Sequence, residues 1–160
     1  MITHLTEGDK IPAFSGQDQD GKTIASADFK GKKWVIYFYP HDNTPTCTTQ
    51  ACNIRDHYTA LKKAHIEIIG ISTDDEKSHR KFIKKYQLPF PLIADTDHRI
   101  ADLFGVWSPK KFMGREFLGL HRTTFLVDEK GLIQKIIHKP KSKQHVQEIL
   151  AAWNELGAIQ

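Results

Sequence analysis

Two apolar runs, separated by a segment of helical periodicity, dominate the first half of the chain. Residues 34–39 read Trp-Val-Ile-Tyr-Phe-Tyr, and residues 66–72 read Ile-Glu-Ile-Ile-Gly-Ile-Ser. Runs rich in β-branched and aromatic residues are typical of strands buried on both faces of a sheet. Between them, apolar residues mark one face of a helix: Ala51, Ile54, Tyr58 and Leu61. The pattern predicts a βαβ unit with parallel strands and a right-handed crossover.

The second half of the chain continues this alternation. Further helices are predicted over residues 75–87, 97–104 and 142–156, and further strands over residues 91–94, 123–128 and 132–138. Turn residues at 18–21 and 128–131 predict two hairpins. The apolar stripe of the last helix comprises Val146, Ile149, Leu150, Trp153 and Leu156. Together these elements predict one α/β domain over residues 1–160, with a central mixed sheet flanked by helices on both faces.

Composition narrows the class of protein. The chain is 39% hydrophobic and 26% charged, which is ordinary for a globular domain, and its net charge is +4. The lysines are scattered, so we expect no binding to nucleic acid. The N-terminus lacks the apolar core of a signal peptide, and no run is long enough to span a membrane, so a cytoplasmic protein is expected. In a reducing compartment, two close cysteines are more often catalytic or metal-binding than structural.

Cys47 follows the first apolar strand at the expected start of a helix. Thr44 and Pro45 form a favourable helix opening, since threonine can cap and proline suits the first helical position. In the first turn, unpaired N–H groups and the helix dipole stabilise a thiolate, which is the reactive form of cysteine. Alternatively, Cys47 is a small buried hydrophobe, because it falls on the same face as the apolar stripe of this helix.

The position of Cys52, the other cysteine of the chain, indicates whether the two thiols could form a disulfide or bind zinc. On an ideal helix the Cα atoms of Cys47 and Cys52 are about 8.6 Å apart, and disulfides fail beyond about 7 Å. Either the two cysteines never bond, so that Cys52 remains a free thiol, or the first helical turn unwinds before they do. Zinc binding is disfavoured because the thiols diverge and the spacing is not Cys-x2-Cys.

The segment around these cysteines resembles the peroxiredoxins. Pro40, Thr44 and Cys47 form Pro-x-x-x-Thr-x-x-Cys, which is similar to the peroxidatic motif of that family. The Cys-x4-Cys spacing between Cys47 and Cys52 is similar to that of the bacterioferritin-comigratory-protein (PrxQ-type) subfamily. The resemblance extends over nearly the whole chain, in residues 18–22, 105–107 and 119–128.

The resemblance implies a thioredoxin-like fold with an N-terminal β extension, and thiol-dependent reduction of hydrogen peroxide and organic hydroperoxides. Cys47 would be the peroxidatic thiolate, and Thr44 would hydrogen-bond both this thiolate and the peroxide. Arg122 would hold the thiolate and stabilise the oxygens as the O–O bond breaks, and Pro40 would shield the site from water. Such fixed donors lower the barrier for charge that develops on a leaving oxygen.

The rest of the cycle is implied in the same way. Cys52 would condense with the sulfenic acid of Cys47 to an intramolecular disulfide, after residues 45–53 unwind. A thioredoxin or glutaredoxin-like dithiol would then reduce this disulfide. No cofactor or metal is implied, and a monomer is expected.

A few positions depart from the subfamily or leave questions open. Thr46 stands where many relatives have glycine, and Gln50 where glutamate is common. His41 and His121 flank the proposed site and could confer a pH dependence. Trp107 with Phe112 is expected to form an apolar patch near the active site. Two rival functions remain, a thioredoxin-like disulfide oxidoreductase, which would usually carry Cys-x-x-Cys, and a redox sensor that signals through Cys47 and Cys52.

Overall fold

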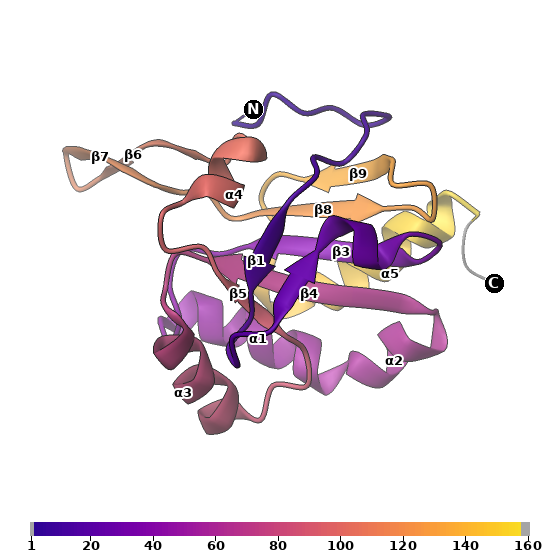
Figure 1. Ribbon diagram of the computed structural model, residues 1–160, viewed down its shortest axis with the longest axis horizontal. Coiled ribbons are helices and arrows are strands. Elements are labelled where there is room, and N and C mark those ends of the chain that lie inside the picture. The colour runs from indigo at the N-terminus through magenta and orange to yellow at the C-terminus, as the bar shows by residue number, and fades with distance from the viewer. Residues whose placement is uncertain (1, 158–160) are drawn as a thin grey trace.

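A five-stranded mixed sheet forms the centre of the protein (Figure 1). The computed structural model describes residues 2–157. The strand order is β5 (Leu92–Ala94), β4 (Ile66–Ser72), β3 (Lys33–Phe38), β8 (Thr123–Val127) and β9 (Ile133–Ile137). β3, β4 and β5 run parallel, whereas β8 is antiparallel to both β3 and β9. The predicted strands are therefore confirmed, with bounds that differ by at most one residue.

The helices cover both faces of this sheet, as predicted. One face packs against α1 (Pro45–Asp56), α2 (Tyr58–Lys63), α3 (Glu76–Tyr86) and α5 (His145–Glu155). The other face is covered by α4 (Arg99–Leu103) and by the N-terminal segment with β1 (Ser15–Gln17), β2 (Thr23–Ala25) and the short helix η1 (Ser26–Phe29). Alternate residues of β3 enter the two cores, Tyr37 on the first face and Phe38 on the second. None of the helices among residues 2–157 is long and apolar enough to cross a membrane.

The helical segment between β3 and β4 is broken, although the sequence indicates one continuous helix. His57 separates α1 from α2, with φ −114° and ψ 17°. Its ring Nδ1 lies 2.9 Å from the carbonyl oxygen of Asn53, which also accepts from the His57 backbone N–H at 3.2 Å. The backbone of His57 therefore departs from helical geometry, while its N–H still bonds to the carbonyl four residues earlier.

The C-terminal helix is shorter than predicted. Residues 142–144 form a separate 3-10 helix, η2 (Ser142–Gln144), and α5 ends at Glu155. Val146, Ile149 and Trp153 are buried as expected. Leu156 lies beyond the last helical residue and is 48% exposed, so its assignment to the apolar stripe was wrong.

A third hairpin, which the sequence analysis did not predict, projects from the body of the protein at the left of Figure 1. It pairs β6 (Trp107–Phe112) with β7 (Arg115–Leu120), whereas the predicted N-terminal hairpin pairs β1 with β2. Trp107 and Phe112 occupy opposite ends of β6. Trp107 stacks on the ring of His98 at 4.3 Å, while Phe112 is 67% exposed near the hairpin tip. The predicted apolar patch of these two residues is therefore wrong.

Candidate active site

Cys47 lies in the first turn of α1, just beyond the end of β3. Thr44 occupies the N-cap position and Pro45 the first helical position, as the sequence predicts. The Thr44 side chain makes no capping bond, and its hydroxyl donates to the carbonyl oxygen of His41 at 3.4 Å. Cys47 is 2% exposed and packs with Ala51 in the core, and its thiol is free. The buried thiol therefore sits where unpaired backbone N–H groups favour an anion.

Arg122 contacts the thiol of Cys47 directly. The pairing of Phe38 with Thr123 between β3 and β8 places Arg122 beside the loop that leads to α1. Its Nη2 lies 3.1 Å from Cys47 Sγ, and its Nη1 donates to Gln50 Oε1 at 2.6 Å. A guanidinium bound to sulfur stabilises the thiolate over the thiol. The structure thus brings together Cys47 and Arg122, which are far apart in the chain.

A second cation, Lys110 of β6, lies close to this pair. Burial and the neighbouring Arg122 guanidinium lower the pKa of Lys110, while the Cys47 thiolate raises it. The Lys110 ammonium donates to the carbonyl oxygen of Leu120 at 2.9 Å. The sequence analysis missed Lys110 because it missed the hairpin that carries it.

Hydrogen bonds continue from Arg122 into the core. Gln50 Nε2 lies 3.3 Å from His145 Nδ1, and His145 Nε2 lies 2.9 Å from Thr124 Oγ1. Gln50, His145 and Thr124 are fully buried. Burial, followed by the charge of Arg122, lowers the pKa of His145 to about 3, so this histidine is neutral at physiological pH.

The loop before α1 is fixed by a partly buried polar cluster. The side chain of His79 contacts Asp42 through Nδ1 at 2.7 Å and the carbonyl oxygen of Ile93 through Nε2 at 2.9 Å. The backbone N–H of Asp42 donates to Asp74 at 2.7 Å. The side chains of Asp42, Asp74 and His79 converge closely enough to hold a cation. However, both ring nitrogens of His79 already meet acceptor oxygens, so the cluster acts to anchor the loop.

Asn53 attaches the second half of α1 to the start of α5. Its amide donates to the carbonyl oxygen of Lys143 at 3.0 Å and to Gln147 Oε1 at 3.2 Å. Its Oδ1 accepts from the backbone N–H of Val146 at 2.9 Å. Cys52, which is half-buried and free, immediately precedes this attachment. The second half of α1 is therefore fixed to η2 and α5 from the residue after Cys52 onward.

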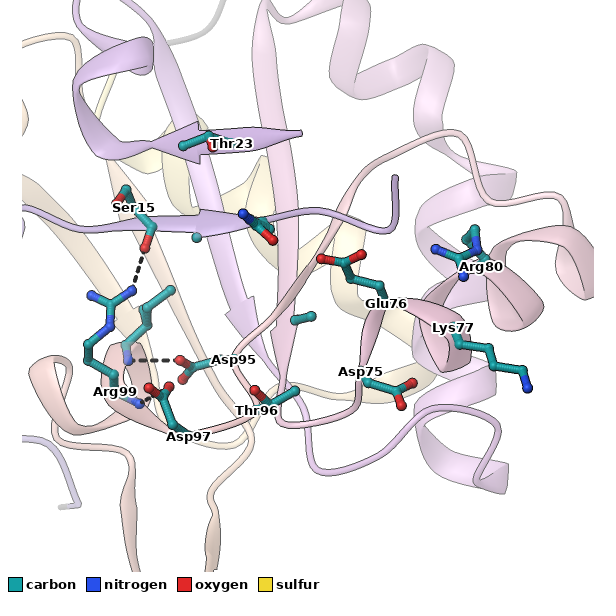
Figure 2. A pocket seen from close by; sticks show the side chains of 14 residues that line it. Ser15, Thr23, Asp75, Glu76, Lys77, Arg80, Asp95, Thr96, Asp97 and Arg99 are labelled. Atoms are coloured by element: carbon teal, nitrogen blue, oxygen red, sulfur yellow. Dashed lines mark hydrogen bonds between the residues drawn. The ribbon is translucent and has the colours of Figure 1, made fainter. Parts of the chain in front are cut away.

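A cavity of about 670 Å³ has neither Cys47 nor Arg122 among its lining residues (Figure 2). Arg99 crosses it to donate to the carbonyl oxygen of Ser15 at 2.6 Å, and Arg80 donates to that of Gln19 at 2.8 Å. Carboxylates from two elements also line it: Asp75, Glu76, Asp95 and Asp97. Its charges are mixed, its arginines bind backbone, and no thiol reaches it. This cavity therefore lacks the groups of the thiol chemistry expected at Cys47.

The buried His145 predicts a specific dependence of stability on pH. An unfolded histidine has a pKa of about 6.5, whereas that of folded His145 is about 3. Unfolding between these pH values takes up one proton, so stability falls as the pH drops. We expect the free energy of unfolding to decrease by about 1.4 kcal/mol per pH unit more in the wild type than in His145→Phe, between about pH 6 and 4.

Urea unfolding of both proteins at several pH values measures this difference. Burial raises the pKa of Asp95, which acts in the opposite direction because the folded state then takes up a proton first as the pH falls. That contribution is common to both proteins and cancels in the comparison. Equal slopes for the two proteins would show that His145 is protonated in the fold.

Comparison with known proteins places this fold and site in a family. The profile of the AhpC/TSA family matches residues 7–136. A putative peroxiredoxin bcp of Haemophilus influenzae is 46% identical over 146 residues, which cover 91% of this chain and 94% of the relative. Peroxiredoxin Bcp of Bacillus subtilis is 42% identical over 150 residues, which cover 94% and 96%.

Solved structures that are similar to this one are also peroxiredoxins. Peroxiredoxin Q of Xanthomonas campestris superposes with a TM-score of 0.85 at 31% identity, over 97% of this chain and 98% of its own. A structure of the bacterioferritin comigratory protein of the same organism, described with its alkyl peroxide reduction activity, has a TM-score of 0.85 at 30% identity, over 94% and 99%.

The thioredoxin fold and these similarities place the protein in the class of thiol peroxidases. The chain belongs to the AhpC/TSA family, and within it to the Bcp (PrxQ-type) peroxiredoxins. Its activity is that of a peroxiredoxin, which acts on peroxides. The fold and family implied by the sequence motifs are thereby confirmed.

Proposed function

We propose that this peroxiredoxin reduces hydrogen peroxide and organic hydroperoxides by a two-cysteine cycle that starts at Cys47. The observation that carries the proposal is the 3.1 Å contact between Arg122 Nη2 and Cys47 Sγ, at a buried helix N-terminus. This setting favours the thiolate, which is the nucleophile required for attack on peroxide. The alkyl peroxide activity described for the Xanthomonas relative supports organic hydroperoxides as substrates.

In the first step, Cys47 Sγ attacks the terminal oxygen of the peroxide. An S–O bond forms as the O–O bond breaks, and the leaving oxygen takes up a proton to depart as water or alcohol. Arg122 stabilises the negative charge that moves from sulfur to the leaving oxygen. Thr44 at the N-cap would donate to the peroxide once its hydroxyl turns from the carbonyl of His41, and Pro40 would limit access of water.

In the second step, Cys52 would attack the sulfenic acid of Cys47, and a disulfide would form with loss of water. Both residues lie in the continuous helix α1, whose ideal geometry keeps them too far apart to bond. The first part of α1 must therefore unwind. The sequence analysis expects residues 45–53 to unwind, but the three hydrogen bonds of Asn53 to η2 and α5 favour an unwound segment that ends at Cys52.

The disulfide would be reduced by a dithiol protein of the thioredoxin or glutaredoxin-like class, in exchange for its own oxidation. A monomer would suit this cycle, because both cysteines and Arg122 come from one chain. A cytoplasmic location would suit it as well, since dithiol reductants keep thiols reduced there.

Intact mass after one equivalent of hydrogen peroxide tests the cycle. We expect the wild type to lose two hydrogens, since a disulfide forms. Cys52→Ser should instead gain one oxygen, because the sulfenic acid of Cys47 has no partner. Cys47→Ser, the matched control, should keep its mass.

Turnover then separates the peroxidase cycle from its rivals. Sustained peroxide consumption with a dithiol reductant is expected, whereas a redox sensor would stop after few turnovers. Reduction of insulin disulfides without peroxide consumption would instead indicate a disulfide oxidoreductase. An unchanged mass of the wild type after peroxide treatment would overturn the proposal.

A further inference from the structure

The hydrogen bonds behind Arg122 allow only one arrangement of protons. A guanidinium has donors and no acceptor, so the atom of Gln50 that meets Arg122 Nη1 at 2.6 Å is the amide oxygen. The amide NH₂ of Gln50 then faces His145 Nδ1 at 3.3 Å, and this nitrogen must accept. The proton of the ring is consequently on Nε2, from which it is donated to Thr124 Oγ1 at 2.9 Å.

From this geometry we propose that His145 is a positioning residue for Arg122. As the neutral tautomer with its proton on Nε2, it binds the NH₂ group of Gln50 and so turns the amide oxygen toward the guanidinium. Arg122 is thereby held with Nη2 on Cys47 Sγ. The inference rests on the proposed function, in which Arg122 acts on the Cys47 thiolate.

The need for such a residue follows from the chemistry of the amide. The two ends of a glutamine amide have nearly the same shape but opposite hydrogen-bonding character. If nothing accepted from the NH₂ group, the amide could rotate and place this donor against the guanidinium, which also only donates. Arg122 would then lose the 2.6 Å hydrogen bond at Nη1, which is one of the two contacts that orient its guanidinium.

The site of His145 is built to keep the ring in place. His145 is fully buried, and its ring packs edge-on against Tyr37 with centroids 5.5 Å apart. Its low pKa, which follows from burial and from the charge of Arg122, agrees with a nitrogen that accepts rather than donates. Since α5 starts at His145, the position of the ring is set by the packing of this whole helix against the sheet.

A double-mutant comparison tests whether His145 works through the amide. Phenylalanine at 145 keeps the aromatic packing but removes the acceptor. Glutamate at 50 has two equivalent oxygens, so it faces Arg122 with an acceptor in either orientation and needs no help from residue 145. All variants carry Cys52→Ser, so that only the oxidation of Cys47 by hydrogen peroxide is measured, by quenched-flow mass spectrometry.

We expect His145→Phe to lower the second-order rate constant of Cys47 oxidation about tenfold when residue 50 is Gln. In the Gln50→Glu background the same change should alter the rate constant less than about twofold. His138→Phe, an equivalent exchange at a histidine outside these hydrogen bonds, should leave the rate constant unchanged.

Equal effects of His145→Phe in both backgrounds would overturn the inference, because a merely structural role does not depend on the residue at position 50. No effect in either background would overturn it as well. If His145→Phe does not fold, Thr124→Val replaces it, since it removes the acceptor that keeps the proton on Nε2. The proposed function fails separately, if the Cys52→Ser parent is not oxidised at all.

Discussion

Replacing Cys47 by serine is expected to abolish peroxide reduction, with a loss of more than about 10⁴-fold in the rate of peroxide consumption. A serine hydroxyl is not ionised at neutral pH, and its oxygen cannot accept the peroxide oxygen as sulfur does to form a sulfenic acid. Serine is also slightly smaller than cysteine, and Arg122 can donate to its hydroxyl. The variant should therefore fold with the buried position 47 intact.

Peroxide consumption in the presence of a dithiol reductant measures this effect, and circular dichroism verifies the fold. Cys52→Ser is the matched control, because it removes the other thiol of the chain and leaves Cys47 in place. It should still complete one oxidation. Turnover by Cys47→Ser above the uncatalysed rate would show that the chemistry lies elsewhere in the molecule.

Replacing Arg122 by methionine is expected to lower the rate constant of Cys47 oxidation by about 10²–10³-fold. Methionine removes both the charge beside Cys47 and the donors to sulfur and Gln50. The loss should appear in the oxidation of the Cys47 thiol itself, since the sulfur loses the cation that contacts it.

Arg122→Lys gives an intermediate result on the same reasoning. It keeps a positive charge, but a single ammonium cannot bind Cys47 and Gln50 in the two fixed directions of a guanidinium. Arg115→Met, at an exposed arginine of β7, is the matched control and should retain the wild-type rate constant. A rate constant for Arg122→Met within a few-fold of the wild type would exclude the assigned role of Arg122.

Local patterns were sufficient to predict the sheet and the position of Cys47. Continuous apolar runs predict β3 and β4, and Thr44 with Pro45 predicts where α1 begins, because these signals depend on neighbouring residues. The catalytic roles of all five site residues remain predictions: Cys47, Cys52, Thr44, Arg122 and Pro40.

The parts that could not be predicted depend on contacts between distant segments or on unusual backbone conformations. His145 reaches Gln50 only because α5 packs against α1, and no local sequence pattern indicates how these two helices are aligned. The β6–β7 hairpin turns at Met113 and Gly114, with φ of 51° and 78°. Methionine rarely adopts a left-handed conformation, so residue 113 did not indicate a hairpin turn. The break at His57 likewise has no signal in the periodicity, because the apolar stripe continues on both sides of this residue.

The attachment of Asn53 to the start of α5 has a consequence for how fast the proposed cycle can close. Starting a helix is the unfavourable step in its formation, whereas adding residues to an existing turn takes nanoseconds per residue. If residues 53–56 remain helical while the preceding turns unwind, they serve as a ready nucleus when the disulfide is reduced. The peroxide-binding turn then regrows backwards from Asn53 towards Thr44, and its recovery is limited by the encounter with the reductant and not by refolding.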